Sequence, residues 1–411
     1  MTNLPQGWEW KSLGEICFIT DGTHKTPNYI ETGIPFLSVK NISKGFFDLS
    51  DVKYISLEEH NKLIKRAKPE FEDILICRIG TLGKAIKISL EFEFSIFVSL
   101  GLLKPKVKII SDYLVYFLNS YFIEGWINDN KVGGGTHTAK LNLNILEKCP
   151  IALPPLKEQE RIVGILDESF AKIDESIKIL EQDLLNLDEL MQSALQKAFN
   201  PLKDNAKENY KLPQGWEWKS LGEIANTSSG GTPSRNKKEY WENGNIKWLK
   251  SGELNDGYID FIEENITEEA IKNSSAKIFQ KGTLLIAMYG ATAGKLGILN
   301  LDSTTNQAIC AFLHKDKNIK FLEKFLFYFL FFLRDKIIKD SFGGAQPNIN
   351  QTYIKNLQIP LPPIKEQEQI ASHLDELSSH VKNLKQNYQA QIKDLQELKN
   401  SLLDKAFKGN L

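Results

Sequence analysis

An internal repeat constrains this chain of 411 residues more than any other feature. Three phrases occur twice in the same order, and each second copy lies 208 residues after the first. The pairs are LPQGWEWKSLGEI at 4–16 and 212–224, LPPLKEQERI at 153–162 with LPPIKEQEQI at 361–370, and QKAF at 196–199 with DKAF at 404–407. Matches at one constant offset indicate a tandem duplication of a structural unit. The length also favours at least two domains, because one hydrophobic core rarely supports so long a chain.

Each half has the same order: an opening phrase, a variable stretch, a Pro-Pro pair and a long helical pattern. The variable stretches match only in islands, such as FEDILICRIGTLGKAIKI (71–88) and GTLLIAMYGATAGKLGIL (282–299). This pattern predicts an α+β fold in which two similar domains share a scaffold but present different surfaces. The predicted segments are domains at 1–152 and 212–360, long helices at 153–200 and 361–411, and a polar linker at 201–211.

The helical patterns carry the apolar spacing of a coiled coil. In the first, apolar residues recur at steps of three and four from Phe170 to Ala198, and the second runs from Leu374 to Leu402 with one slip. Each helical segment of about 43 residues, such as 157–199, would measure ~65 Å at ~1.5 Å per residue, which exceeds the size of its own domain. We therefore predict that the two helices pair antiparallel about a pseudo-two-fold axis. The alternative is that each helix packs only on its own domain.

Charge does not exclude nucleic acid as a partner, although the net charge is −1. Residues 4–152 carry 18 Lys and Arg against 17 Asp and Glu, and residues 212–360 carry 18 against 16. The acidic excess lies in residues 157–199, with 5 basic against 10 acidic side chains. Phosphate contacts depend on local patches, so two slightly basic domains remain compatible with DNA.

The cysteines and the apolar runs indicate a protein of the cytoplasm. Cys17, Cys77, Cys149 and Cys310 lie far apart without a CxxC pair, so we expect free thiols and no metal site. We see no export signal in the first residues. The aromatic run 325–333 is nine residues long, whereas a bilayer span needs roughly twenty, so we predict a buried core helix and no membrane contact.

Taken together, these phrases resemble the specificity subunits of Type I restriction-modification systems. The resemblance rests on the repeated phrases and on DGTHKTPNYIETGIPFLSVKNIS (21–43) and SSGGTPSRNKKEYWENGNIKWLKSGEL (228–254), and it covers the whole chain. It implies a non-catalytic subunit with two target-recognition domains, each reading one half of a bipartite site in double-stranded DNA. The helices would set the spacer between the half-sites and bind two methylation subunits. S-adenosylmethionine, ATP and Mg would belong to the methylation and restriction subunits, and no cofactor to this chain.

Two Gly-Lys turns are candidate DNA contacts. Gly80–Lys84 and Gly290–Lys295 are too short for a phosphate loop of a nucleotide-hydrolysing enzyme and lack its Ser or Thr. Each turn either only closes a strand or presents amides and side chains to DNA phosphates. The candidates in and beside them are Arg78, Thr81, Lys84, Tyr289, Thr292 and Lys295.

Polar loop tips at 22–27, 133–138, 230–235 and 343–348 are further candidates. Such tips can reach base edges in the major groove, although each also fits an ordinary solvated turn. Their candidate residues are Thr23, His24, Lys25, Thr136, His137, Ser234, Arg235, Gln346 and Asn348. The tryptophans of the opening phrase are predicted to pack instead, because identical residues are poor readers of different sequences.

The KEQE runs after each Pro-Pro pair fit either solvated first turns or contacts with a methylation subunit. Their candidate interface residues are Lys157, Glu158, Gln159, Lys365, Glu366 and Gln367. The sequence contains neither a phosphate loop nor the tetrapeptide of adenine methyltransferases. That absence points away from an enzyme, and a structural coiled-coil adaptor with protein-binding end domains is the alternative function.

Overall fold

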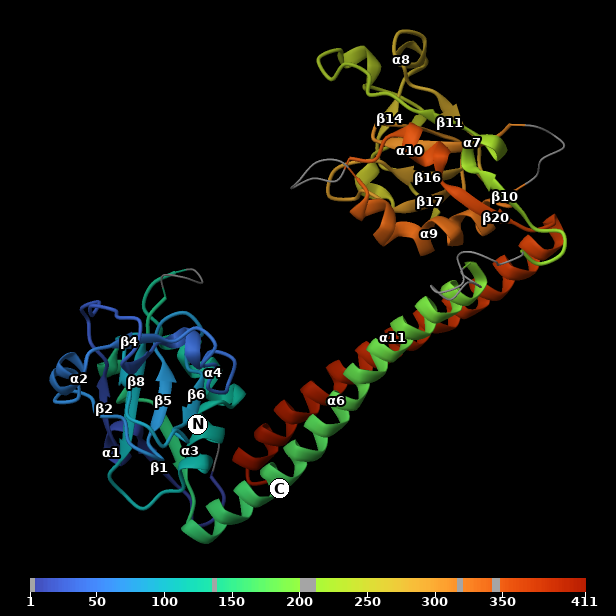
Figure 1. The fold of residues 1–411 in the computed structure, drawn as a ribbon. Coiled ribbons are helices and arrows are strands. Elements are labelled where there is room, and N and C mark those ends of the chain that lie inside the picture. The colour runs from blue at the N-terminus through green and yellow to red at the C-terminus, as the bar shows by residue number, and fades with distance from the viewer. Residues whose placement is uncertain (1–3, 135–138, 200–211, 316–320, 342–347) are drawn as a thin grey trace. The chain divides into compact units, whose positions relative to one another are not determined.

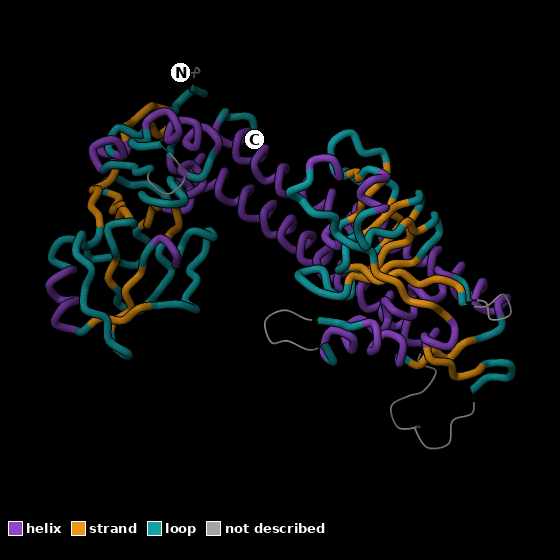
Figure 2. Tube along the Cα trace, turned by 90° about the horizontal axis from the view of Figure 1, so that it is seen from above, coloured by secondary structure: helices purple, strands orange, loops and turns teal. Residues whose placement is uncertain are grey.

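The computed structural model describes residues 4–134, 139–199, 212–315, 321–341 and 348–411 (Figure 1). The chain forms two compact units, one of residues 1–181 with 389–411 and the other of residues 182–388. Each unit contains one globular domain and a part of both long helices. Strands and helices are mixed within each domain, which confirms the predicted α+β class (Figure 2).

The first domain contains a four-stranded sheet, a three-stranded sheet and short helices. The larger sheet has the order β2 (Cys17–Asp21), β8 (Leu100–Pro105), β5 (Ile74–Cys77), β6 (Ala85–Lys87), all antiparallel. The smaller has the order β4 (Lys53–Ile55), β3 (Ile34–Leu37), β7 (Ser95–Ile96), with β3 and β7 parallel. The helices are α1 (Leu13–Ile16), α2 (Leu57–Leu63), α3 (Ser111–Leu118), α4 (Tyr121–Asn130) and α5 (Leu143–Leu146), with a 3-10 turn η1 (Val39–Asn41).

The second domain repeats this plan with one more strand in each sheet. That sheet has the order β11 (Ala225–Ser229), β19 (Ile309–His314), β16 (Leu284–Ala287), β17 (Leu296–Leu299), β13 (Gly257–Ile259). The smaller has the order β14 (Asn265–Ile266), β12 (Ile246–Leu249), β18 (Ser303–Thr305), β15 (Ile278–Phe279). The helices are α7 (Leu221–Ile224), α8 (Glu268–Lys272), α9 (Glu323–Lys339) and α10 (Gln351–Asn356), with 3-10 turns η2 (Lys238–Tyr240) and η3 (Ser251–Glu253).

The central strands are apolar throughout because both of their faces are buried. In β5, Ile74 and Ile76 belong to one core cluster, and the alternate residues Leu75 and Cys77 belong to another. Side chains alternate between the faces of a strand, so the run ILIC serves two cores at once. β16 does the same with LLIA. Helix α9 lies in the second core, as the aromatic run predicts. In the described part of the chain, no helix is both long and apolar enough to span a bilayer.

The repeated opening phrase forms the same ribbon in both domains. β1 (Glu9–Ser12) pairs antiparallel with β9 (Pro150–Leu153), and β10 (Glu217–Ser220) pairs with β20 (Gln358–Leu361). The glutamate of SLGE accepts a hydrogen bond from the serine N–H at 2.6 Å in α1 and 2.5 Å in α7, a capping box that ends each ribbon strand. Trp8 and Trp10 pack on the first core as predicted, whereas Trp218 is 49% exposed.

The two long helices, α6 (Leu156–Phe199) and α11 (Ile364–Phe407), are antiparallel within each unit. In the first unit Arg161 contacts the Leu411 carbonyl, and Asp174, further along α6, forms an ion pair with Lys399. In the second unit Asp188 pairs with Lys385. Figures 1 and 2 both show the helices side by side. The predicted antiparallel coiled coil is therefore confirmed, although the predicted seam residues Leu384 and Leu398 stay exposed, at 39% and 45%.

The end of each long helix completes the core of the domain encoded by the other half. Phe407, at the end of α11, packs against Tyr113 and Phe117 of the first domain, with ring centroids 5.7 and 4.9 Å apart. Phe199, at the end of α6, packs against Phe325 and Phe329 of the second domain, at 5.3 and 5.6 Å. The KAF endings repeat because both make this contact. This packing excludes the alternative in which each helix serves only its own domain.

Candidate nucleic-acid interface

Three loops of the first domain meet where β2 and β5 end. Asp21, the last residue of β2, is 1% exposed, and its carboxylate accepts hydrogen bonds from Arg78 and Arg66. His24 Nε2 lies 3.0 Å from the same carboxylate. Lys140 forms bridges with Ile79 and Val132, so Val132 and Lys140, which flank the predicted loop at 133–138, also lie near this point. The structure thus brings together the predicted loop at 22–27, the first Gly-Lys turn and the residues that flank the predicted loop at 133–138.

The Asp21 carboxylate is ionised because two guanidinium groups surround it. Burial alone would raise the pKa of Asp21, but the hydrogen bonds from Arg66 and Arg78 outweigh burial and hold this pKa below its ordinary value. Arg78 is only 9% exposed and also donates to the Leu141 carbonyl at 2.9 Å. The prediction that Arg78 contacts DNA therefore needs correction, since its guanidinium is used inside the domain.

Other predicted residues of the first domain lie at the surface. His24, Lys25 and Thr81 are exposed, and Thr23 and Lys84 are half-buried. The structure adds Arg66, whose side chain is 54% exposed while it pairs with Asp21. Arg66 follows helix α2 and belongs to no glycine loop, so no sequence motif marks it as a candidate. Thr136 and His137 lie outside the described residues.

The second domain gathers its predicted loops in the same way, through neutral contacts. Thr232 donates to the Gln307 side chain at 2.5 Å, and the same side chain lies beside the Tyr289 hydroxyl. Tyr289 also forms a bridge with the exposed Asn348. Burial raises the pKa of Tyr289, so its hydroxyl stays protonated. Lys295 is exposed and Thr292 half-buried beside them, while Gln346 lies outside the described residues.

Arg235 is held in place by aromatic rings. Its guanidinium carbon lies 3.7 Å from the Trp241 ring centroid and 4.9 Å from that of Trp248. Its Nη2 atom lies 2.7 Å from Glu264 Oε2, an ion pair that lacks hydrogen-bond alignment. The side chain is still 52% exposed, so one face of a positioned cation remains open to a ligand. The neighbouring Ser234 is exposed.

The four cysteines lie in the cores of the two domains. All four cysteines are free and buried, as predicted, and burial raises the pKa of each thiol to about 12. Neutral thiols are poor nucleophiles and poor metal ligands. Within the described ranges, no group of three His, Cys, Asp or Glu side chains is placed to hold a metal ion.

The starts of the long helices differ from the prediction at two positions. Lys157 and Lys365 are exposed, and Glu158 and Glu366 are half-buried. Gln159 and Gln367 are each 1% exposed and hydrogen-bond inside the chain, which corrects their assignment as subunit contacts. A glutamine within a charged run is expected to face solvent, but in this fold each domain covers its glutamine.

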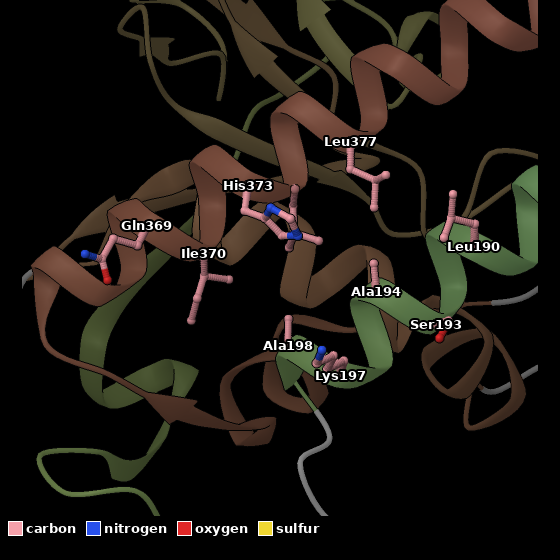
Figure 3. A pocket seen from close by; sticks show the side chains of 10 residues that line it. Leu190, Ser193, Ala194, Lys197, Ala198, Gln369, Ile370, His373 and Leu377 are labelled. Carbon is pink, nitrogen blue, oxygen red and sulfur yellow. The ribbon is translucent and has the colours of Figure 1, made fainter.

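An apolar groove of about 620 Å³ lies between the long helices in the second unit (Figure 3). Side chains of both helices line it, and most of them are aliphatic. The lining residues are Leu190, Ser193, Ala194, Lys197, Ala198, Gln369, Ile370, His373, Leu374 and Leu377. An exposed apolar surface of this kind is typical of a protein-binding site.

Comparison with known proteins agrees with this architecture. The Type I restriction modification DNA specificity domain matches residues 5–184 and 213–394. The StySPI specificity subunit of Salmonella potsdam is 27% identical over 99% of this chain and 90% of its own length. The EcoKI specificity subunit of Escherichia coli is 26% identical with the same two coverages.

Two solved structures share the fold along the whole chain. A chain of a type I R-M system aligns with a TM-score of 0.80 at 23% identity, covering 100% of both chains. The HsdS subunit from Thermoanaerobacter tengcongensis aligns with a TM-score of 0.62 at 23% identity, covering 100% of this chain and 99% of its own. Because the family match covers most of both repeats, the chain belongs to the family of Type I restriction modification DNA specificity proteins.

Proposed function

We propose that this chain is the sequence-reading subunit of a Type I restriction-modification complex and performs no catalysis itself. The observation that carries the proposal is the duplicated scaffold with unlike loops. One domain carries Arg66, His24 and Lys25 beside the end of β2. The other carries Gln307 and Asn348 on its predicted loops and Arg235 against Trp241. Two different surfaces on one scaffold suit the two halves of an asymmetric DNA site.

The long helices would set the unread spacer between the half-sites and bind two methylation subunits. The apolar groove between α6 and α11 and the exposed Lys157 and Lys365 are the candidate surfaces for those subunits. S-adenosylmethionine, ATP and Mg²⁺ would be bound by the methylation and restriction subunits, and the assembly would act in the cytoplasm. The adaptor alternative is not favoured, because the matched family consists of DNA specificity domains.

A domain exchange tests the proposal. Residues 17–150 are replaced with the matching segment of a relative, and methylated adenines are mapped in cells that carry the complete system. We expect one half of the methylated sequence to change while the other half and the spacer stay the same. A change in both halves would refute the modular reading. Gel shifts of the wild-type complex should also weaken steeply with salt, since phosphate contacts release counterions.

A further inference from the structure

A buried glutamine ties the first domain to the start of its own long helix. The Gln159 side chain donates from Nε2 to the Pro154 carbonyl at 2.9 Å, and its Oε1 accepts from the Ile110 N–H at 3.0 Å. Ile110 is the residue before helix α3, where backbone N–H groups lack partners inside the helix. Gln159 therefore joins the Pro-Pro turn, the long helix and the start of α3 with one buried amide.

The second domain has the same connection. Gln367 donates to the Pro362 carbonyl at 2.9 Å and accepts from the Leu322 N–H at 2.8 Å, directly before α9. The glutamines are 208 residues apart, whereas Ile110 and Leu322 are 212 apart. The variable segment has thus changed length between the repeats, yet the same contact is made.

A second connection lies two turns further along each long helix. The Tyr116 hydroxyl of α3 donates to Asp167 of α6 at 2.5 Å, and the Tyr328 hydroxyl of α9 donates to Asp375 of α11 at 2.8 Å. Burial and the neighbouring carboxylate raise the pKa of both tyrosines, so both hydroxyls stay protonated and remain donors. Each aspartate lies eight residues after its glutamine, on the same face of the helix.

We propose that these two contacts form a duplicated clamp that fixes the angle between each recognition domain and the long helix leaving it. The start of each long helix also packs on the core of its domain, through Ile162 and Leu166 in the first domain and Ala371 and Leu374 in the second. Apolar packing sets no particular direction, whereas two hydrogen-bonded contacts separated along the helix resist both tilt and rotation. The loops that read DNA differ between the domains, but the clamp is the same. The clamp therefore controls a property that does not depend on which bases are read, and we assign to it the spacing between the two half-sites. This last step rests on the proposed function.

The two clamps differ in how well they are supported. At Tyr116 the Phe170 ring packs edge-on, with centroids 5.5 Å apart. At Tyr328 a polar cavity of about 590 Å³ adjoins the Tyr328–Asp375 pair, and Lys324 forms an ion pair with the same carboxylate. The second clamp depends more on its polar contacts, so we expect their removal to loosen the second domain more than the first.

The first test reports on the angle between the second domain and α11 in the absence of DNA. Spin labels are attached to full-length protein carrying Lys281→Cys in the second domain and Asn383→Cys on α11, both exposed positions. The four native cysteines are buried and should not react. Adding Gln367→Met with Tyr328→Phe removes three hydrogen bonds while keeping volume, and we expect the distance distribution between the labels to widen about twofold. An unchanged width would overturn the clamp.

Tyr353→Phe is the matched control. The Tyr353 hydroxyl donates to Asp340 at 3.0 Å, the same kind of pair, but both residues lie inside the second domain. Its removal should leave the width unchanged. Equal widening in the control would show that general loosening of the domain, rather than the clamp, sets the distance, and would also overturn the proposal.

The second test measures spacer choice in the complex with methylation subunits. Methylation is compared on DNA with intact half-sites and the native spacer or one base pair more. We expect the clamp variant to lose about tenfold of its preference for the native spacer, equivalent to about 1.4 kcal/mol, with unchanged half-site sequences. A uniform loss at both spacers would mean a purely structural role and refute the link to spacing. If wild-type protein directs no sequence-specific methylation but the labels respond as expected, the proposed function fails and the mechanical clamp stands.

Discussion

Replacing Phe407 with alanine should destabilise the first domain selectively, although residue 407 belongs to the second repeat. Phe407 is 9% exposed and packs against Tyr113 and Phe117. Truncation of a buried phenylalanine costs ~3–5 kcal/mol. The two ring contacts place Phe407 near the middle of that range, at about 4 kcal/mol, of which about 1 reflects the ring geometry. With a urea dependence of ~2 kcal/mol per molar, the midpoint of the first domain should fall by about 2 M.

Hydrogen exchange followed by mass spectrometry at increasing urea is the appropriate assay, because it reports each domain separately and does not require two-state unfolding of the whole chain. Peptides from β5 and β8 should lose protection early, while those from β16 and β19 should keep the wild-type midpoint. Phe199→Ala should give the reverse pattern, since Phe199 packs in the second core. Lys405→Ala, at an exposed neighbouring position, is the control. A shift below about 1 kcal/mol, or equal shifts in both domains, would refute completion of each core by the other repeat's helix.

Three further outcomes follow from the site. Because the pKa of Asp21 is lowered in the folded state, its contribution to stability is present above its unfolded pKa of ~3.9 and is lost as pH falls through the folded pKa. Asp21→Asn should therefore reduce the loss of first-domain stability in acid, measured as the free energy of unfolding at a series of pH values. Lys25→Ala should weaken binding of the complex to all DNA sequences alike and reduce the slope of log K against log salt by about 1, measured by fluorescence anisotropy; a change in base preference instead would contradict a phosphate contact. Arg235→Lys should cost about 1 kcal/mol in binding the second half-site, because an ammonium cannot stack on the Trp241 ring as a planar guanidinium does. The loss should be the same whatever the sequence of the first half-site, and a loss that varies with that sequence would argue against this role.

The sequence predicted the arrangement of the elements well where the signal was periodic or repeated. The heptad spacing from Phe170 onward requires a partner surface, and the second copy of that spacing identifies the partner. The role of the KAF endings was not predictable in the same way. A phenylalanine at the end of a helix shows that something covers it, but the covering rings of Tyr113 and Phe117 lie almost three hundred residues away in the chain.

The candidate site was predicted at the level of loops and missed at the level of some side chains. The Gly-Lys turn correctly marks where β5 ends, and a glycine turn suggests that the neighbouring Arg78 is exposed. Only the fold places Asp21 beside Arg78 and so buries it. The prediction that Gln159 contacts another subunit is wrong for a different reason. The charged residues around Gln159 indicate that it faces solvent, but in the fold its side chain is the acceptor for the Ile110 N–H.

The contrast between the loops at the ends of β2 and β11 and the clamp shows how the two repeats have diverged. Asp21 ends β2 in the first domain, and Ser229 ends β11 at the corresponding place in the second. Ser229 accepts a hydrogen bond from Gln351 at 2.6 Å, so a neutral amide occupies the place that two guanidinium groups take in the first domain. The charge beneath the loops has therefore changed, although the Gln and Tyr–Asp contacts to the long helices have not. Divergence at one end of a domain with retention at the other is what independent requirements on base recognition and on domain angle would produce.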